Sequence, residues 1–190
     1  MRLFVAVAIP PEIREALRRL VGELRSEIRG PRWVRPEGIH LTLRFLGEVE
    51  EPSLPGLVAE LERSLPGSVT PFDVEVAGIG VFPERGRPRV LWVGLDEAGD
   101  RLSTLQRRVE SAVATAVPNL KKETRPFAPH LTLARFGDAR PPAGLGATIA
   151  RYGGERRPRL GTFTVMSVHL LQSLLGPGGA EYRQLGEYRL

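Results

Sequence analysis

Two histidines each open the same tetrapeptide, which occurs twice in the chain. His40-Leu41-Thr42-Leu43 and His130-Leu131-Thr132-Leu133 are 130 − 40 = 90 residues apart, and the whole sequence holds 3 histidines. An imidazole gains and loses a proton near neutral pH, and a hydroxyl donates a hydrogen bond to an anion. The repeat therefore supplies two proton-transfer groups and two hydrogen-bond donors from equivalent positions.

The duplication extends beyond the tetrapeptides at the same offset. The matching positions are Arg35-Pro36 with Arg125-Pro126, Gly47 with Gly137, Glu48 with Asp138, Pro52 with Pro142 and Gly56 with Gly146. Two half-chains of similar length therefore each carry one histidine and one threonine.

Residues around each motif alternate between apolar and polar side chains, which is the period of a half-buried strand. In such a strand His40 and Thr42 project from one face, while leucines on the other face anchor the strand in a core. His130 and Thr132 repeat this arrangement. Two such faces opposed across a cleft would present two imidazoles and two hydroxyls to one ligand.

Two chemistries fit these residues poorly. A catalytic zinc usually takes three protein ligands, whereas the motifs supply two imidazoles, no carboxylate and, in a chain without cysteine, no thiolate. We therefore expect no metal and no cofactor. A threonine nucleophile beside a histidine base is the second possibility, but neither motif contains a carboxylate to orient the histidine.

Paired acid–base catalysis on a phosphate ester uses all four side chains. One neutral imidazole takes a proton from the attacking oxygen and one imidazolium gives a proton to the leaving oxygen. These oxygens lie on opposite sides of phosphorus, and the threonine hydroxyls can donate to the non-bridging oxygens. The alternative is two core histidines left by a decayed duplication, which a repeated polar pair in apolar strands argues against.

The elements that must position the motifs follow from periodicity and from proline and glycine breaks. Strands are expected over residues 2–9, 39–46, 72–81, 89–95, 130–136, 162–171 and 180–190, and helices over 12–28, 53–65, 100–117 and 145–152. Each half then repeats the order helix, histidine strand, helix, strand, turn, strand. We expect an α+β fold, a bilobal pseudo-twofold duplication with two antiparallel sheets flanking a central cleft and helices packed outside. Residues 1–190 should form a single domain of two intimate lobes.

Composition bounds the partners and the compartment. The formal net charge is +5, and 25 of the 27 basic residues are arginine, because Lys121 and Lys122 are the only lysines. This balance favours an anionic partner such as RNA, although GC-rich codon usage raises arginine equally well. The lack of cysteine fits a reducing cytoplasm, and no apolar run approaches the roughly 20 residues of a membrane helix. We expect a cytoplasmic monomer without membrane contact.

Several stretches together resemble one known family. They are Arg2-Leu3-Phe4-Val5-Ala6-Val7, His40-Leu41-Thr42-Leu43-Arg44-Phe45-Leu46-Gly47, Gly78-Ile79-Gly80-Val81-Phe82-Pro83 and Pro129-His130-Leu131-Thr132-Leu133-Ala134-Arg135. The repeated His-x-Thr-x motif is similar to that of the two-histidine phosphoesterase superfamily. The closer resemblance, over nearly the whole chain, is to the RNA 2′,3′-cyclic phosphodiesterase family, also called 2′–5′ RNA ligase.

The resemblance implies a function and a role for each motif residue. It implies hydrolysis of an RNA 2′,3′-cyclic phosphate end to a 2′-phosphate. The same site could run a slow 2′–5′ ligation, in which a 5′-hydroxyl replaces water. By this likeness His40 is the proton donor and His130 the proton acceptor. Thr42 and Thr132 contact the phosphate, and Arg135 helps to hold it. The position equivalent to Arg135 in the first half is Phe45.

Weaker candidates and alternative functions remain. His169 has no threonine two places on, so we expect a structural role or a place at the cleft rim. Arg85, Arg87 and Arg89 lie on a turn-rich loop that could follow an RNA backbone or be a solvated hairpin tip, and Trp33, Phe45 and Phe136 could stack on a base or pack in the core. The alternative substrates are a small cyclic nucleotide or an ADP-ribose cyclic phosphate. A non-catalytic RNA- or nucleotide-binding module is the alternative from another class.

Overall fold

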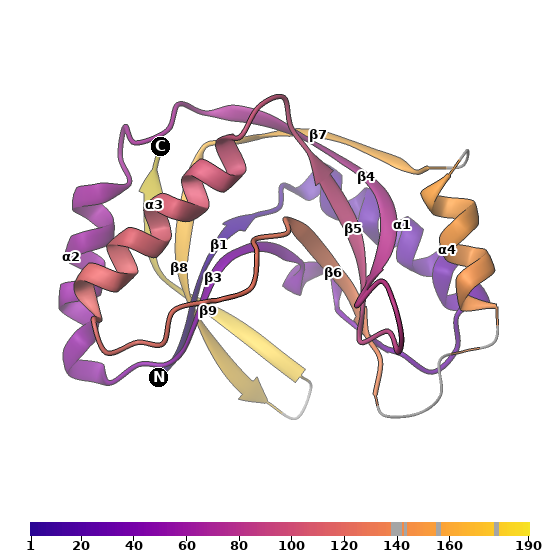
Figure 1. Cartoon of the computed structure of the whole chain (residues 1–190), viewed down its shortest axis with the longest axis horizontal. Helices are drawn as coiled ribbons and strands as arrows, with labels where there is room; N and C mark the ends of the chain where they lie inside the picture. Colours follow the sequence, from indigo (N-terminus) through magenta and orange to yellow (C-terminus); the bar gives the residue numbers. More distant parts are fainter. Residues whose placement is uncertain (138–141, 143, 155–156, 177–178) are drawn as a thin grey trace.

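The structure is a computed structural model that describes residues 1–190 except 138–141, 143, 155–156 and 177–178 (Figure 1). The described strands are β1 Arg2–Ala8, β2 Arg32–Trp33, β3 His40–Glu48, β4 Phe72–Phe82, β5 Val90–Asp96, β6 His130–Arg135, β7 Arg159–Val165, β8 Ser167–Gly176 and β9 Gly179–Arg189. The helices are α1 Pro11–Glu27, α2 Leu54–Ser64, α3 Arg101–Ala116 and α4 Leu145–Gly153, with 3₁₀ turns η1 Pro36–Gly38 and η2 Glu51–Ser53. The α+β class is confirmed.

The strands form one antiparallel sheet made of two four-stranded halves. The order is β7-β4-β5-β6-β3-β1-β8-β9, and β2 pairs with the part of β6 that β3 leaves free. The two halves join at the β3–β6 boundary through the residue pair Leu41–Leu131. The two expected sheets are therefore present as the halves of one curled sheet.

Elements of the two repeats are exchanged between the halves. After α2 the chain crosses to place β4 beside β5 and β7, and after β7 it returns to place β8 beside β1 and β9 beside β8. Helices α1 and α4 lie over β7 and β4, whereas α2 and α3 lie over β9 and β3 (Figure 1). Each half-sheet is thus covered by one helix from each repeat.

Helix α1 shows how the pattern produces the core. Pro11 starts the helix, where its missing N–H costs nothing. The three-four spacing then turns one face toward the sheet, with Ile13, Leu17 and Leu24 at most 2% exposed. The motif leucines Leu41 and Leu131 belong to the same hydrophobic cluster. Burying them holds the two histidine strands against the helices.

One expected strand is wrong. The structure divides residues 162–171 between β7 and β8, with Met166 between them and 63% exposed. The reason is topological, because β7 pairs with β4 in one half while β8 pairs with β1 in the other. Both segments have strand-forming composition, so periodicity alone could not reveal the crossing.

A few expectations fall on undescribed residues. Asp138, the counterpart of Glu48, and Pro141 lie outside the described part of the chain, as do Pro177 and Gly178 of the expected turn. Gly176 and Gly179 on either side of that turn are paired in the β8–β9 ladder. No helix in the described ranges is long and apolar enough to cross a membrane.

Candidate active site

The register between β3 and β6 brings the two motifs together. Leu41 pairs with Leu131, and the strands are antiparallel. One step in either direction sets His40 opposite Thr132 and Thr42 opposite His130. Directly opposed residues point to the same face, and alternation turns that face away from the buried leucines. Each imidazole therefore lies beside the threonine of the other motif.

Each imidazole is oriented in the same way by its own backbone. Nδ1 of His40 is 2.9 Å from the Gly38 carbonyl oxygen, and Nδ1 of His130 is 2.7 Å from that of Ala128. A carbonyl only accepts, so Nδ1 must carry a proton and donate it. This leaves Nε2 of both rings as the nitrogen that can gain or lose a proton.

Aromatic rings cover both histidines, and the sequence did not reveal them. Phe4 stacks on His40 with ring centroids 4.7 Å apart, and Tyr182 meets the same imidazole edge-on at 5.1 Å. Phe82 meets His130 edge-on at 5.0 Å. Because Phe4, His40 and Tyr182 come from β1, β3 and β9, this half of the sheet must curl around the imidazole. No local pattern could connect His40 with a ring so far along the chain.

Burial and nearby positive charge keep both imidazoles neutral. Burial is the main cause that lowers the pKa of His40 from 6.5 to about 4, with smaller contributions from Arg135 and His130. The Nδ1 bond to Gly38 opposes this shift. Burial, followed by the charge of Arg135, also lowers the pKa of His130. Since Arg135 acts on both rings, it belongs to the same site.

A β-bulge explains how Arg135 reaches this face. Strict alternation would point a residue five places after His130 to the opposite side of the strand. The β5–β6 ladder slips by one residue between Leu91 and Trp92, which leaves Leu133 without a partner. A bulge of this kind re-aims the residues that follow it. Arg135 is therefore exposed on the histidine face.

The same irregularity in the first half presents Phe45. The β1–β3 ladder slips between Val5 and Ala6, so that Leu43 is skipped. Phe45 is 51% exposed and lies 5.8 Å from the ring of Phe4. The two halves thus offer a guanidinium on one side and an aromatic ring on the other.

His169 lies outside this constellation. It is 9% exposed, its Nδ1 is 3.1 Å from Gln184 Oε1, and its Nε2 is 3.1 Å from Ser167 Oγ. The amide oxygen accepts from Nδ1–H, so the hydroxyl of Ser167 donates to Nε2. Both nitrogens are engaged, which fits the expected structural role.

The other weak candidates divide between core and surface. Trp33 and Phe136 pack against the hydrophobic core, as expected for their commoner role. Arg85 and Arg87 are exposed on the β4–β5 hairpin loop. The backbone of Arg89 binds Phe82 and Phe136 at the base of that loop.

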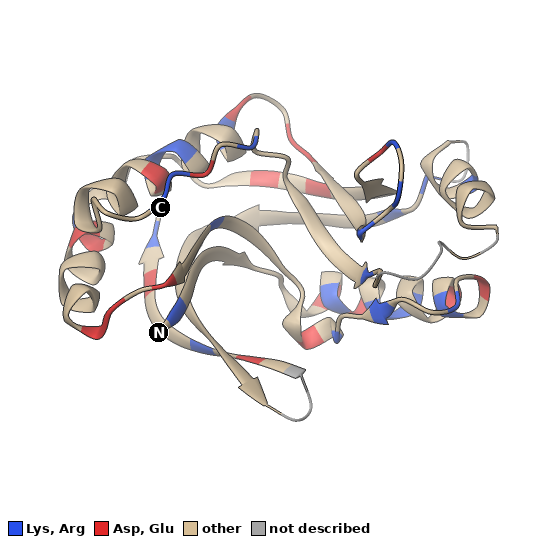
Figure 2. Cartoon of the chain, turned by 60° about the horizontal axis from the view of Figure 1, so that its bottom comes forward, with Lys and Arg blue, Asp and Glu red and all other residues tan. Residues whose placement is uncertain are grey.

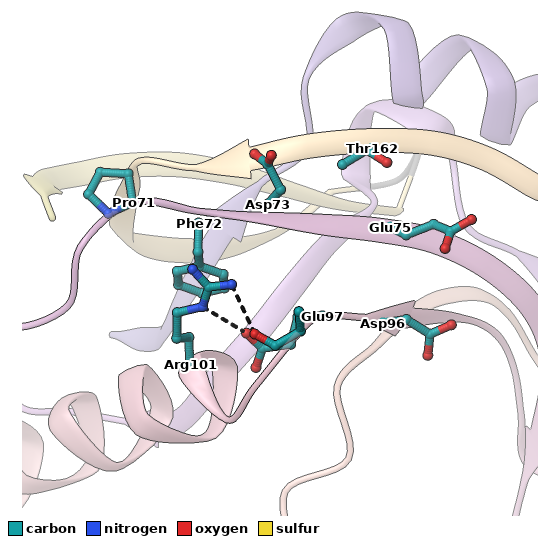
Figure 3. Close-up of a pocket in the computed structure, with 9 residues that line it drawn as sticks. Pro71, Phe72, Asp73, Glu75, Asp96, Glu97, Arg101 and Thr162 are labelled. Carbon is teal, nitrogen blue, oxygen red and sulfur yellow. Dashed lines mark hydrogen bonds and ion pairs between the residues drawn. The ribbon is translucent and has the colours of Figure 1, made fainter.

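A separate hollow of about 530 Å³ contains none of the motif residues. Its acidic lining includes Asp96 on β5, and Figure 3 shows Arg101 paired with Glu97 among the lining residues. Asp96 is paired with Arg157. Carboxylates disfavour a phosphate, so we do not place the reaction there. Among the residues that the structure describes, no three His, Asp or Glu side chains gather as metal ligands.

Comparisons with known proteins agree with this geometry. The chain matches the family model described as LigT-like phosphoesterase twice, over residues 7–92 and 93–182. It is 36% identical to the RNA 2′,3′-cyclic phosphodiesterase of Archaeoglobus fulgidus, over 97% of this chain and 98% of that one. The protein of the same name from Aquifex aeolicus is 30% identical over 100% and 97%. The crystal structure of TT0787 of Thermus thermophilus superposes with a TM-score of 0.80 at 31% identity, covering 100% of this chain and 98% of that chain.

Proposed function

The chain belongs to the LigT-like phosphoesterase family, and from that membership we propose that it hydrolyses the 2′,3′-cyclic phosphate at the 3′ end of RNA to a 2′-phosphate. The antiparallel register around Leu41 and Leu131 carries the proposal, because it sets two imidazoles and two hydroxyls around one place on the sheet. The names of the curated relatives supply the substrate.

The reaction needs one proton taken and one proton given. A water oxygen attacks phosphorus while Nε2 of one imidazole accepts the water's proton. The bond from phosphorus to O3′ breaks, and the other histidine protonates O3′ from its own Nε2. Thr42, Thr132 and Arg135 donate to the non-bridging oxygens, whose charge grows in the transition state. A 5′-hydroxyl in place of water gives a 2′–5′ linkage, and no metal or cofactor takes part.

The family resemblance makes His40 the donor and His130 the acceptor. A donor must be protonated, whereas the pKa of His40 in the free protein is about 4. The anionic cyclic phosphate stabilises an imidazolium beside it and therefore raises this pKa on binding. On this view substrate binding itself charges the acid, and His130 accepts the proton from water.

The chain offers a direct test on an oligoribonucleotide with a 2′,3′-cyclic end. We expect wild type to convert the cyclic end to a 2′-phosphate equally well in excess EDTA, and His40→Ala or His130→Ala to lower kcat by about 10²–10⁴-fold. His169→Gln is the matched control, because the ring nitrogens of His169 contact Ser167 and Gln184 and none of the motif residues, and it should stay within about threefold of wild type. Loss of activity in EDTA that zinc restores would revive a metal mechanism.

The same assay separates the alternatives. Turnover of a nucleoside 2′,3′-cyclic phosphate or of ADP-ribose cyclic phosphate in preference to RNA would favour a small-molecule phosphodiesterase. RNA binding without any turnover by wild type would favour a binding module. We also propose a cytoplasmic monomer. Sedimentation of the purified chain would test the monomeric state, and fractionation of cells would test the location.

A further inference from the structure

Two arginines lie directly opposite each other beside the motif strands. In the β2–β6 ladder Arg32 pairs with Arg135, and the next pair is Trp33 with Ala134. Ala134 is fully buried and Trp33 packs on the core, so this second pair faces the helices. Alternation turns Arg32 and Arg135 to the opposite face, which is the face of the histidines and threonines.

Neither arginine of this pair has a charge partner within the described ranges of the chain. Elsewhere guanidiniums meet carboxylates, as Arg18 does with Glu15 and Glu37. Like charges directly opposite on neighbouring strands destabilise a sheet. A pair of this kind is relieved by an anion, and guanidiniums bind phosphate with two parallel hydrogen bonds. Figure 2 shows basic residues on α1, on the β4–β5 loop and at the end of β6, with acidic residues interspersed on α1 and on the loop.

The two arginines differ in their distance from the histidines. The charge of Arg135 lowers the pKa of both imidazoles, whereas Arg32 contributes to neither. Arg32 lies across from Arg135 on β2, which pairs with the part of β6 that β3 leaves free, and neighbouring strands are about 4.8 Å apart. Arg135 therefore serves the reacting phosphate, and Arg32 is placed for a second anion next to it.

Strand β2 holds Arg32 in this place before any ligand arrives. The amide of Val34 donates to the Leu133 carbonyl over 2.8 Å and continues the pairing beyond β2. The guanidinium of Arg25 on α1 lies over the Trp33 ring, 5.7 Å from its centroid. Arg32 is thus the exposed residue of a segment fixed on both sides.

We propose that Arg32 binds the phosphodiester that joins the terminal nucleotide of the substrate to the rest of the RNA. The inference rests on the proposed function. A cyclic phosphate occupies the 3′ end of its chain, so the next phosphate can only lie on the 5′ side of the terminal nucleoside. A nucleoside 2′,3′-cyclic phosphate has no such group. Arg32 therefore makes the site prefer an RNA end to a small cyclic nucleotide.

The test compares Arg32→Gln with wild type on three substrates. These are a trinucleotide with a 2′,3′-cyclic end, the same trinucleotide with a neutral methylphosphonate at its last linkage, and a nucleoside 2′,3′-cyclic phosphate. We expect Arg32→Gln to lower kcat/KM on the natural trinucleotide about tenfold, mainly through KM. Wild type should show a kcat/KM about tenfold lower on the methylphosphonate than on the natural trinucleotide. For Arg32→Gln, kcat/KM should be the same on these two substrates. On the nucleoside 2′,3′-cyclic phosphate, the kcat/KM values of the variant and of wild type should agree within twofold.

Arg19→Gln is the matched control, because Arg19 is an exposed arginine on α1 and its loss changes the net charge equally. It should leave all three rates within twofold of wild type. The salt dependence of log kcat/KM on the trinucleotide should become shallower by about 0.7 in Arg32→Gln.

Two results would overturn the inference while leaving the proposed function intact. One is an equal loss in Arg32→Gln on the trinucleotide and on the cyclic nucleoside, which would put Arg32 on the reacting phosphate. The other is a variant that remains as sensitive to the methylphosphonate as wild type is. Failure of wild type to hydrolyse any of the substrates would instead refute the proposed function, and the role of Arg32 with it.

Discussion

Both imidazoles owe their chemistry to a carbonyl two residues before them. Gly38 and Ala128 each accept a hydrogen bond from Nδ1, which fixes the tautomer and leaves Nε2 as the nitrogen that can gain or lose a proton. Sequence reasoning identified the histidines and threonines because the repeat marks them. It could not find Phe4, Tyr182 or the opposition of Arg32 to Arg135, because cross-strand neighbours depend on register and curl.

The lowered pKa values set the direction of the pH dependence. One histidine must be charged and the other neutral, and in the free protein both pKa values lie below the ordinary 6.5. His40, the proposed acid, has a pKa of about 4 in the free protein, so raising the pH toward 6.5 already removes its proton. We expect kcat/KM to peak below pH 6.5 and to fall about tenfold per pH unit above about pH 7.

The fall in kcat should occur at higher pH, because bound phosphate raises the pKa of the acid. Initial rates between about pH 4.5 and about pH 9 measure both, and a kcat/KM that still rises through about pH 8 would contradict the assignment.

At the scale of elements, two β-bulges and one buried ion pair determine which side chains of β3 and β6 lie on the same face as the histidines. Periodicity predicted nearly every strand and helix to within a few residues, because each buries one face. It did not predict the bulges at Leu43 and Leu133, which break the alternation. The role of Arg135 accordingly came from family resemblance, and its placement on the histidine face came only from the slipped register.

The first bulge also turns Arg44 inward, where it ties β3 to α3. Arg44 is 6% exposed, its Nε lies 2.7 Å from Glu110, and its Nη2 donates to the Lys121 carbonyl over 2.5 Å. We expect Arg44→Ala to lower the free energy of unfolding by about 3 kcal/mol, because it leaves Glu110 partly buried without its partner. Arg63→Ala, which breaks a surface pair with Glu60, should cost only a small fraction of that, because water screens exposed charges. Urea unfolding of the three proteins measures both changes, and equal losses would contradict the assigned role of Arg44.

The whole molecule is built from interleaved halves. The sequence predicted the duplication and the order of elements within it. It did not predict that β4 and β5 join the half that contains β6, or that β8 and β9 join the half that contains β3, because hydrophobic periodicity is the same in either half. The exchange makes the core continuous from Leu17 on α1 to Leu105 on α3.

We expect the chain to unfold as one unit. A fragment of residues 1–92 would keep β4 without its β5 partner beyond Trp92. It would also lose β8, which pairs with β1, and β9, which pairs with β8. Urea transitions followed by tryptophan fluorescence and by far-UV circular dichroism should coincide for the intact chain. The fragment should show no cooperative transition. Two separated transitions in the intact protein would mean that the halves fold independently.

The crossed arrangement of the motifs has a consequence for how such a protein could arise. Each histidine faces the threonine of the other repeat, so a single ancestral half could have held a phosphate only as a homodimer, with identical surroundings on both sides. Fusion of two copies into one polypeptide releases that constraint, because a change in one copy no longer appears in the other. Arg135 and Phe45 at matching positions are the trace of this release: the two sides of the histidine face have become different, with a guanidinium on one and an aromatic ring on the other.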